Sequence, residues 1–133
     1  MGCQDAKARE YDLEERLIDF GVRIMDVVEA LPRSRVGNHV ADHLLRSGTS
    51  PAFHYGEAES AESRNDFIHK MKVCLKELRE ARIALLMVDR KRLLPARKTS
   101  DILAECEELV RIFSSSVRTA QTKRPDSRRP QGK

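Results

Sequence analysis

The chain has 133 residues, of which 40% are hydrophobic, 35% charged and 5% aromatic, and this length supports one hydrophobic core rather than two. Its formal net charge of +4 is uneven, since residues 118–133 carry six Lys/Arg against one Asp and the rest of the chain is nearly neutral. No apolar run approaches the roughly 20 residues that cross a bilayer, and the first residues do not resemble a signal peptide. Cys3, Cys74 and Cys106 lack the spacing of a disulfide framework or a zinc site. A cytoplasmic location is therefore expected.

Apolar residues at steps of three and four predict four helices, and no segment shows the alternation of a strand. The first helix is expected from about residue 12 to residue 31, where Pro32 ends it. Its apolar stripe consists of Leu13, Leu17, Phe20, Ile24, Val28 and Leu31. The second begins near Ser34, a suitable N-cap. Its apolar positions are Val36, Val40, Leu44 and Leu45. Because Pro51 removes an amide donor, we expect this helix to fray or kink there and to end by Gly56.

The third helix has the strongest pattern, an apolar seam that repeats over three heptads. The seam consists of Phe67, Met71, Cys74, Leu78, Ala81, Leu85 and Val88. Ser63 and Asp66 resemble a capping box at its start. The fourth helix starts at residue 99 or 100, and its apolar positions include Ile102, Cys106, Leu109 and Phe113. Short connections favour an all-α, antiparallel up-down-up-down bundle over residues 12–117, between a flexible segment 1–11 and a disordered basic tail 118–133.

Large apolar residues also lie on the side of the third helix opposite its seam. Ile83, Leu86 and Met87 fall where a solvated helix normally carries charge. Such a patch predicts an interface with another subunit. The alternative is that this helix is central and enclosed by its own chain.

An antiparallel order brings the first and third connections to the same end of the bundle. The basic residues of these connections are Arg33, Arg35, Arg90, Lys91, Arg92, Arg97 and Lys98. Asp89 is the one acid near them, whereas acidic residues gather at the other end. We expect the basic end to attract phosphate backbones, together with tail residues Arg118, Lys123, Arg124, Arg128 and Arg129. The alternative is that these are ordinary solvated residues.

Few aromatic residues remain for stacking on bases. Tyr11, Phe53 and Tyr55 are the ones not assigned to the core. Binding of RNA or DNA should therefore depend strongly on salt and weakly on sequence.

Catalytic and metal-binding patterns are weak. His39 and His43 lie on one helix face, but His-x-x-x-His is common by chance and a third ligand would have to come from elsewhere. No nucleophile elbow or glycine-rich phosphate loop occurs, and Cys74 and Cys106 occupy core positions. We expect a protein without enzymatic activity, cofactor or metal, and keep a metalloprotein with His39 and His43 as ligands as an alternative.

Several segments in fixed order resemble one family. They are Leu44-Leu-Arg-Ser-Gly-Thr-Ser50, Glu57-Ala58, Ser63-Arg-Asn-Asp-Phe-Ile-His-Lys70 and Leu75-Lys-Glu77. This set resembles the signature of the bacterial four-helix-bundle proteins, also called 23S rRNA intervening-sequence proteins, over residues 13–117. Here Pro51 replaces the usual aliphatic residue, Ala52-Phe53 the usual Gly-Ala, and His54 the usual Asn.

The resemblance implies a helical bundle that assembles into a homopentameric ring and has no enzymatic activity. The family is similar to accessory proteins of diversity-generating retroelements, which implies nucleic acid and a reverse transcriptase as candidate partners. A nucleic-acid accessory protein is therefore the favoured function. A protein-interaction scaffold that does not bind nucleic acid is the alternative.

Overall fold

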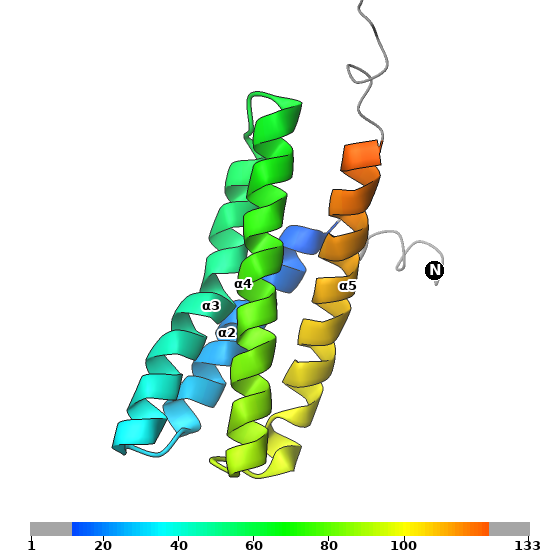
Figure 1. Ribbon diagram of the computed structural model, residues 1–133. Coiled ribbons are helices and arrows are strands. Elements are labelled where there is room, and N and C mark those ends of the chain that lie inside the picture. Colours follow the sequence, from blue (N-terminus) through cyan, green and yellow to red (C-terminus); the bar gives the residue numbers. More distant parts are fainter. Residues whose placement is uncertain (1–11, 123–133) are drawn as a thin grey trace, which may run out of the picture.

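The computed structural model describes residues 12–122 (Figure 1). Its elements are α2 (Leu13–Ala30), α3 (Arg35–Glu59), α4 (Arg64–Lys91), the short 3-10 helix η1 (Ala96–Lys98) and α5 (Ser100–Thr122). The four long helices lie side by side and alternate in direction, as predicted, and these residues contain no strand. Segments 1–11 and 123–133 lie outside the described residues. Across residues 12–122, no helix combines the length and apolarity needed to cross a membrane.

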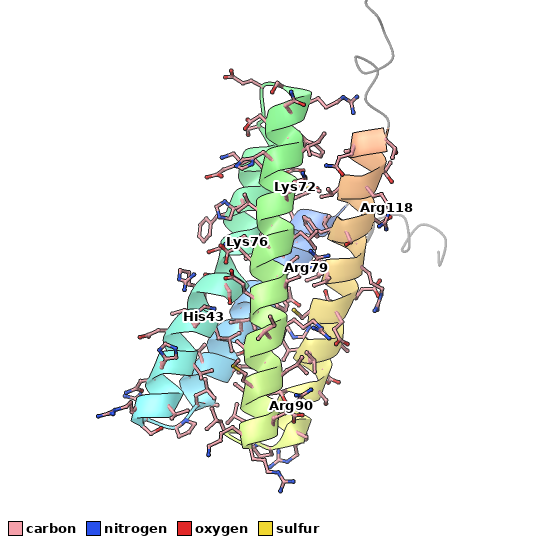
Figure 2. The ribbon with its side chains drawn as sticks, in the orientation of Figure 1. His43, Lys72, Lys76, Arg79, Arg90 and Arg118 are labelled. Atoms are coloured by element: carbon pink, nitrogen blue, oxygen red, sulfur yellow. The ribbon has the colours of Figure 1, made fainter. Side chains whose placement is uncertain are left out.

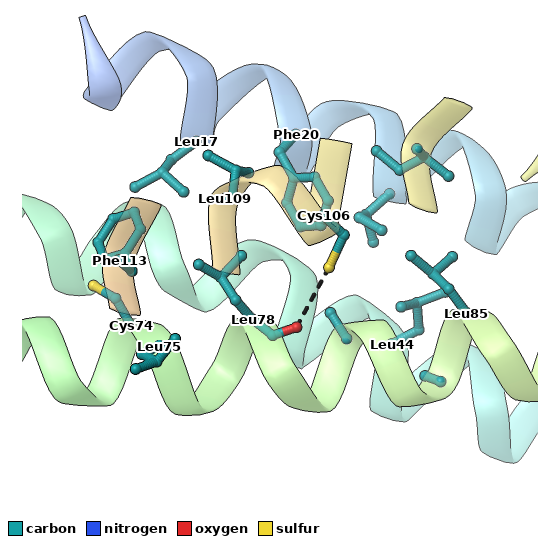
Figure 3. Close-up of a cluster of buried hydrophobic side chains, with 14 of the residues drawn as sticks. Leu17, Phe20, Leu44, Cys74, Leu75, Leu78, Leu85, Cys106, Leu109 and Phe113 are labelled. Atoms are coloured by element: carbon teal, nitrogen blue, oxygen red, sulfur yellow. Dashed lines mark hydrogen bonds between the residues drawn. The ribbon is translucent and has the colours of Figure 1, made fainter. Parts of the chain in front are cut away.

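The core lies between the four helices (Figure 3) and uses the predicted seam of α4. Its largest fully buried side chains include Phe20, Leu44, Leu78, Leu109 and Phe113. The two core cysteines are free thiols that hydrogen-bond to carbonyl oxygens. Cys106 Sγ donates to the Leu78 carbonyl at 3.4 Å, and Cys74 Sγ donates to the Pro51 carbonyl at 3.5 Å. Burial raises the pKa of both thiols to about 12, so both stay protonated at neutral pH.

Helices α2 and α3 approach closely at a stretch of small residues. Ser47 and Gly48 are buried, and a Cβ atom at position 48 would lie 2.6 Å from Cγ2 of Ile24. These small residues let the two helix backbones pack closely.

The expected end of the second helix by Gly56 is wrong, because α3 continues through Pro51 to Glu59. Proline within a helix costs about 3 kcal/mol, and packing offsets this cost. Pro51 is buried, and its own carbonyl accepts the Cys74 thiol of α4. The ring of Pro51 is therefore buried and its carbonyl oxygen hydrogen-bonded, through contacts that the local sequence does not reveal.

Two further expectations need correction. Val36 and Leu45, two of the apolar positions from which the second helix was predicted, are exposed. The last helix extends past residue 117 to Thr122, so Arg118 is helical rather than part of a disordered tail. Helix α5 packs chiefly on α4 and much less on α2. A two-bond ion pair also joins it to α2, in which Arg16 Nε and Nη2 donate to Glu105 at 3.1 and 2.9 Å.

Candidate nucleic-acid interface

The α2–α3 and α4–α5 connections lie at the same end of the bundle (Figure 1). This end carries seven basic residues, which we call the basic pole: Arg33, Arg35, Arg90, Lys91, Arg92, Arg97 and Lys98. All seven are exposed. None forms an ion pair with another residue of the range 12–122. Their charges are therefore available to an external anion.

The α2–α3 connection is a tight corner that holds two of these arginines. Ser34 Oγ accepts the Gly37 N–H at 3.0 Å, and the Ser34 N–H donates to the Pro32 carbonyl at 3.1 Å. A Cβ atom at position 37 would lie 1.9 Å from that carbonyl oxygen, so this approach of the backbone requires glycine. Arg33 and Arg35 flank Ser34 and project from a well-defined backbone.

The first turn of α3 contains no acidic residue. The N-terminus of a helix carries a partial positive charge from unpaired N–H groups. Arg35 adds a full charge at the same place, where a carboxylate would be the stabilising choice. The pole is thus more positive here than its side chains alone would make it.

The end of α4 places an arginine in a conformation that favours glycine. Arg92 has φ 58° and ψ 42°, the one positive φ of a non-glycine residue within the described range. Its N–H donates to the Asp89 carbonyl at 3.1 Å, and the Leu93 N–H donates to the Val88 carbonyl at 3.0 Å. This is the Schellman pattern, whose left-handed position usually holds glycine. Arg92 thus places a cation in a backbone conformation that is unfavourable for a residue with a side chain.

The α4–α5 connection is anchored by Leu94 and Thr99, which are both buried. Beside it lies a groove of about 290 Å³ that brings Arg97 and Lys98 near the carboxylates of Asp26 and Asp101. Arg23 also lines this groove. The expectation that Asp89 is the one acid near these cations is therefore wrong, because Asp26 and Asp101 also lie beside them and lower the local potential around Arg97 and Lys98.

Not every predicted binding residue reaches the pole. Arg118 lies toward the other end of α5, while Arg90 lies at the pole (Figure 2). Lys123, Arg124, Arg128 and Arg129 fall outside the described residues.

The order and topology of these helices have counterparts among known proteins. The sequence profile of the 23S rRNA-intervening sequence proteins matches residues 9–115. The chain belongs to this family. A crystal structure of a protein of unknown function from the S23 ribosomal protein family of Bacteroides thetaiotaomicron is similar, with 29% identity and a TM-score of 0.73. The match covers 78% of this chain and 96% of that one. Among curated proteins, none matches.

His54, singled out in the sequence as a departure from the family signature, joins a polar network far from the pole. Glu57 Oε1 accepts Lys70 Nζ at 3.1 Å and lies 3.3 Å from His54 Nδ1. Lys70 and His54 together lower the pKa of Glu57. The network ties α3 to α4 at the acidic end.

The histidine pair of α3 lies at the surface. His43 Nε2 is 3.9 Å from Glu80 Oε1, and His43 Nδ1 is 3.3 Å from the guanidinium of Arg46. Within residues 12–122, no group of three or more His, Cys, Asp or Glu side chains is placed to hold a metal ion. A nearby guanidinium also opposes a bound cation.

The residues predicted to form an interface with another subunit lie at the surface. Ile83 and Met87 are exposed and Leu86 is half-buried. The sequence interpretation missed a second apolar surface, formed by Ile18, Val22, Met25 and Phe53. In the sequence, this surface is indicated by the i, i+4, i+7 spacing of Ile18, Val22 and Met25, which form a second apolar stripe beside the core stripe of the helix.

Proposed function

We propose that this protein is a non-enzymatic, self-associating helical bundle that binds RNA or DNA backbones through the basic pole and its C-terminal tail. One observation carries the proposal: seven exposed cations from two corners meet at one end, without ion-pair partners among residues 12–122. Cations so placed bind phosphates by releasing counterions.

The aromatic residues favour backbone contact over base recognition. Tyr55 packs edge-on against Phe113, with ring centroids 5.9 Å apart, and so belongs to the core rather than to a stacking surface. Phe53 is exposed but lies in the second half of α3, far along the helix from Arg35. The described part of the basic pole therefore offers charge without a stacking platform.

Self-association would bring the basic poles of several copies together. Ile83, Leu86 and Met87 are the proposed contact, and the family resemblance favours a ring of five. In a ring with aligned axes, each copy adds seven cations to one face, which raises the local potential for a polyanion. The resemblance to retroelement accessory proteins makes a reverse transcriptase a candidate partner.

The test is fluorescence anisotropy with a labelled RNA of mixed sequence. Affinity should fall steeply between about 50 and 200 mM salt. The double variant Arg33→Gln/Lys91→Gln should bind more weakly, with a slope of log affinity against log salt reduced by about 2. A matched variant away from the pole, Arg64→Gln/Arg111→Gln, should keep the slope of the unmodified chain. Binding that ignores salt, or equal losses in both variants, would overturn the proposal.

The exposed apolar surfaces favour a second candidate, a protein-interaction scaffold. A scaffold would leave RNA unbound even at low salt and would copurify with one defined protein at fixed stoichiometry. Loss of that partner on substitution of an exposed apolar residue, with no RNA binding at 50 mM salt, would favour the scaffold over the nucleic-acid function.

A further inference from the structure

The groove beside the α4–α5 connection lies between α2 and the start of α5, and we call it the α2–α5 groove. Its volume is about 290 Å³. It is open because α5 packs chiefly on α4 and much less on α2. The ion pair of Arg16 with Glu105 joins the two helices seven residues before Arg23, about 10 Å farther from the pole at 1.5 Å per residue. The two helices are thus tied at that level and leave a groove toward the basic pole.

Five charged side chains line this groove. Arg23 and Asp26 come from α2, and Arg97, Lys98 and Asp101 come from η1 and the first turn of α5. None of the five forms an ion pair with another residue of the range 12–122. Three cations and two carboxylates therefore share one small space without neutralising one another in pairs.

The rest of the lining is apolar. Val27, Leu94 and Ile102 belong to the core and also line the groove. Apolar contacts combined with a few convergent polar groups are typical of small-molecule sites, whose volumes run from roughly 300 to 1,000 Å³. The α2–α5 groove lies at the lower end of that range, so its ligand must be small.

The charges define the chemistry of this ligand. The guanidinium groups of Arg23 and Arg97 suit a phosphate, because each can donate two parallel hydrogen bonds to it. The carboxylates of Asp26 and Asp101 only accept hydrogen bonds, so they repel a bare phosphate and suit hydroxyl groups instead. Acidic side chains bind ribose hydroxyls in this way in nucleotide sites.

A ribonucleoside monophosphate meets all three requirements. Its phosphate monoester carries about two negative charges for the three cations, its ribose offers hydroxyl donors, and its base offers an apolar face to the core residues of the groove. Inorganic phosphate lacks the second and third features, and a nucleoside lacks the first.

We propose that the α2–α5 groove binds one ribonucleoside monophosphate, either free or as the phosphorylated 5′ end of an RNA strand. Arg23, Arg97 and Lys98 hold the phosphate, and Asp26 and Asp101 accept the ribose hydroxyls. This inference deepens the proposed function, because Arg97 and Lys98 belong to the basic pole. Arg23 does not belong to the pole, so the groove and the pole can be tested separately.

The first test is isothermal titration calorimetry of the full chain at about 50 mM salt, where charges are weakly screened. AMP should bind with one site per chain. Adenosine and inorganic phosphate should each bind at least tenfold more weakly, and 2′-deoxy-AMP should bind more weakly than AMP. In NMR spectra, the methyl signals of Val27 and Ile102 should shift when AMP is added.

Variants then separate the groove from the pole. Arg23→Gln should weaken AMP binding at least tenfold, as expected for the loss of charge-assisted hydrogen bonds. It should keep the salt slope for RNA with a 5′-hydroxyl end. Arg33→Gln/Lys91→Gln should do the reverse, with normal AMP binding and a reduced RNA slope. Circular dichroism should confirm unchanged helix content in each variant.

The carboxylates have a test of their own. Asp26→Asn/Asp101→Asn should bind AMP and 2′-deoxy-AMP with equal affinity, a change in selectivity that a merely structural role would not produce. Arg64→Gln, which removes an exposed cation at the other end of the bundle, is the control and should leave AMP binding unchanged.

Competition with short RNA strands identifies the source of the nucleotide. If 5′-phosphorylated RNA displaces AMP and 5′-hydroxyl RNA does not, the groove binds an RNA end, and if neither does, it binds the free nucleotide. Equal displacement by both strands, equal binding of adenosine and AMP, full affinity of Arg23→Gln or no binding of AMP would overturn this inference. RNA binding through the pole would still stand in those cases. An unchanged RNA slope in Arg33→Gln/Lys91→Gln, with AMP bound normally, would overturn the proposed function and leave the groove.

Discussion

A Cβ atom added to Gly48 of α3 would lie 2.6 Å from Cγ2 and 2.7 Å from Cγ1 of Ile24 in α2. Both atoms branch from the β-carbon of Ile24, so the side chain cannot move aside by rotating a flexible end. Gly48→Ala should therefore force α2 and α3 apart. We expect a loss of about 1–3 kcal/mol in the free energy of unfolding, measured by urea denaturation.

Gly56, in the same helix, is the matched control for Gly48. A Cβ atom there meets no atom within 4 Å. Gly56→Ala should stabilise the protein by about 0.5–1 kcal/mol, because alanine restricts the unfolded chain without a clash. Equal effects at the two positions would contradict the packing described here.

Arg92 should show opposite effects on stability and binding. Arg92→Gly removes a residue with a side chain from left-handed backbone, so the free energy of unfolding should rise by about 1 kcal/mol. The same change removes a cation from the basic pole and should weaken RNA binding. Arg92→Ala should weaken binding equally without the gain in stability. Weaker folding of Arg92→Gly would argue against the helix-end conformation.

The buried thiols should make the protein sensitive to alkaline pH. Their pKa values rise from the ordinary 9.0 to about 12 in the folded chain. The unfolded chain therefore loses these protons first, and stability that is present below pH 9 is lost as pH rises toward 12.

The free energy of unfolding, measured by urea denaturation at several pH values, tests this expectation. It should fall more steeply above pH 9 in the unmodified chain than in Cys74→Ala/Cys106→Ala. The alanine variant should be less stable overall because it has two cavities. Parallel pH profiles would show that the thiols do not contribute.

The ion pair between Arg16 and Glu105 should govern how firmly α5 is held. Glu105→Gln weakens two charge-assisted hydrogen bonds between α2 and α5 and should cost about 1 kcal/mol. Amide hydrogen exchange should accelerate in α5 more than in α4. Glu108→Gln is the control, because its partner Arg111 lies on the same helix and both are exposed to water.

Local patterns predicted much of this fold. Six of the seven seam residues of α4 are buried and Phe67 is partly buried, because one periodic stripe persists from Phe67 to Val88. Ser63 Oγ accepts the Asp66 N–H at 3.0 Å, as the capping pattern indicates. Both connections carry the expected cations to one end because their shortness enforces antiparallel neighbours. These features depend on residues near one another in sequence.

Other features depend on partners distant in sequence. Pro51 stays buried within α3, where its carbonyl accepts the Cys74 thiol of α4. Tyr55 joins the core through Phe113 of α5. On α2, periodicity marks two apolar stripes, and only the positions of α3 and α5 decide that Ile18 and Val22 lie outside. A single sequence does not rank such stripes, so the apolar surface formed by Ile18, Val22, Met25 and Phe53 emerged only from the packed helices.

The length of α5 sets the shortest nucleic acid that can reach both ends of the bundle. Its 23 residues run from the basic pole to the opposite end, about 35 Å at 1.5 Å per residue. Thr122, the last residue of α5, therefore lies about one bundle length away from Arg33 and Arg35. At 3.4 Å per base pair, a duplex of about ten pairs is the shortest rigid ligand that spans this distance, so footprint size should report whether one molecule engages both ends of a subunit.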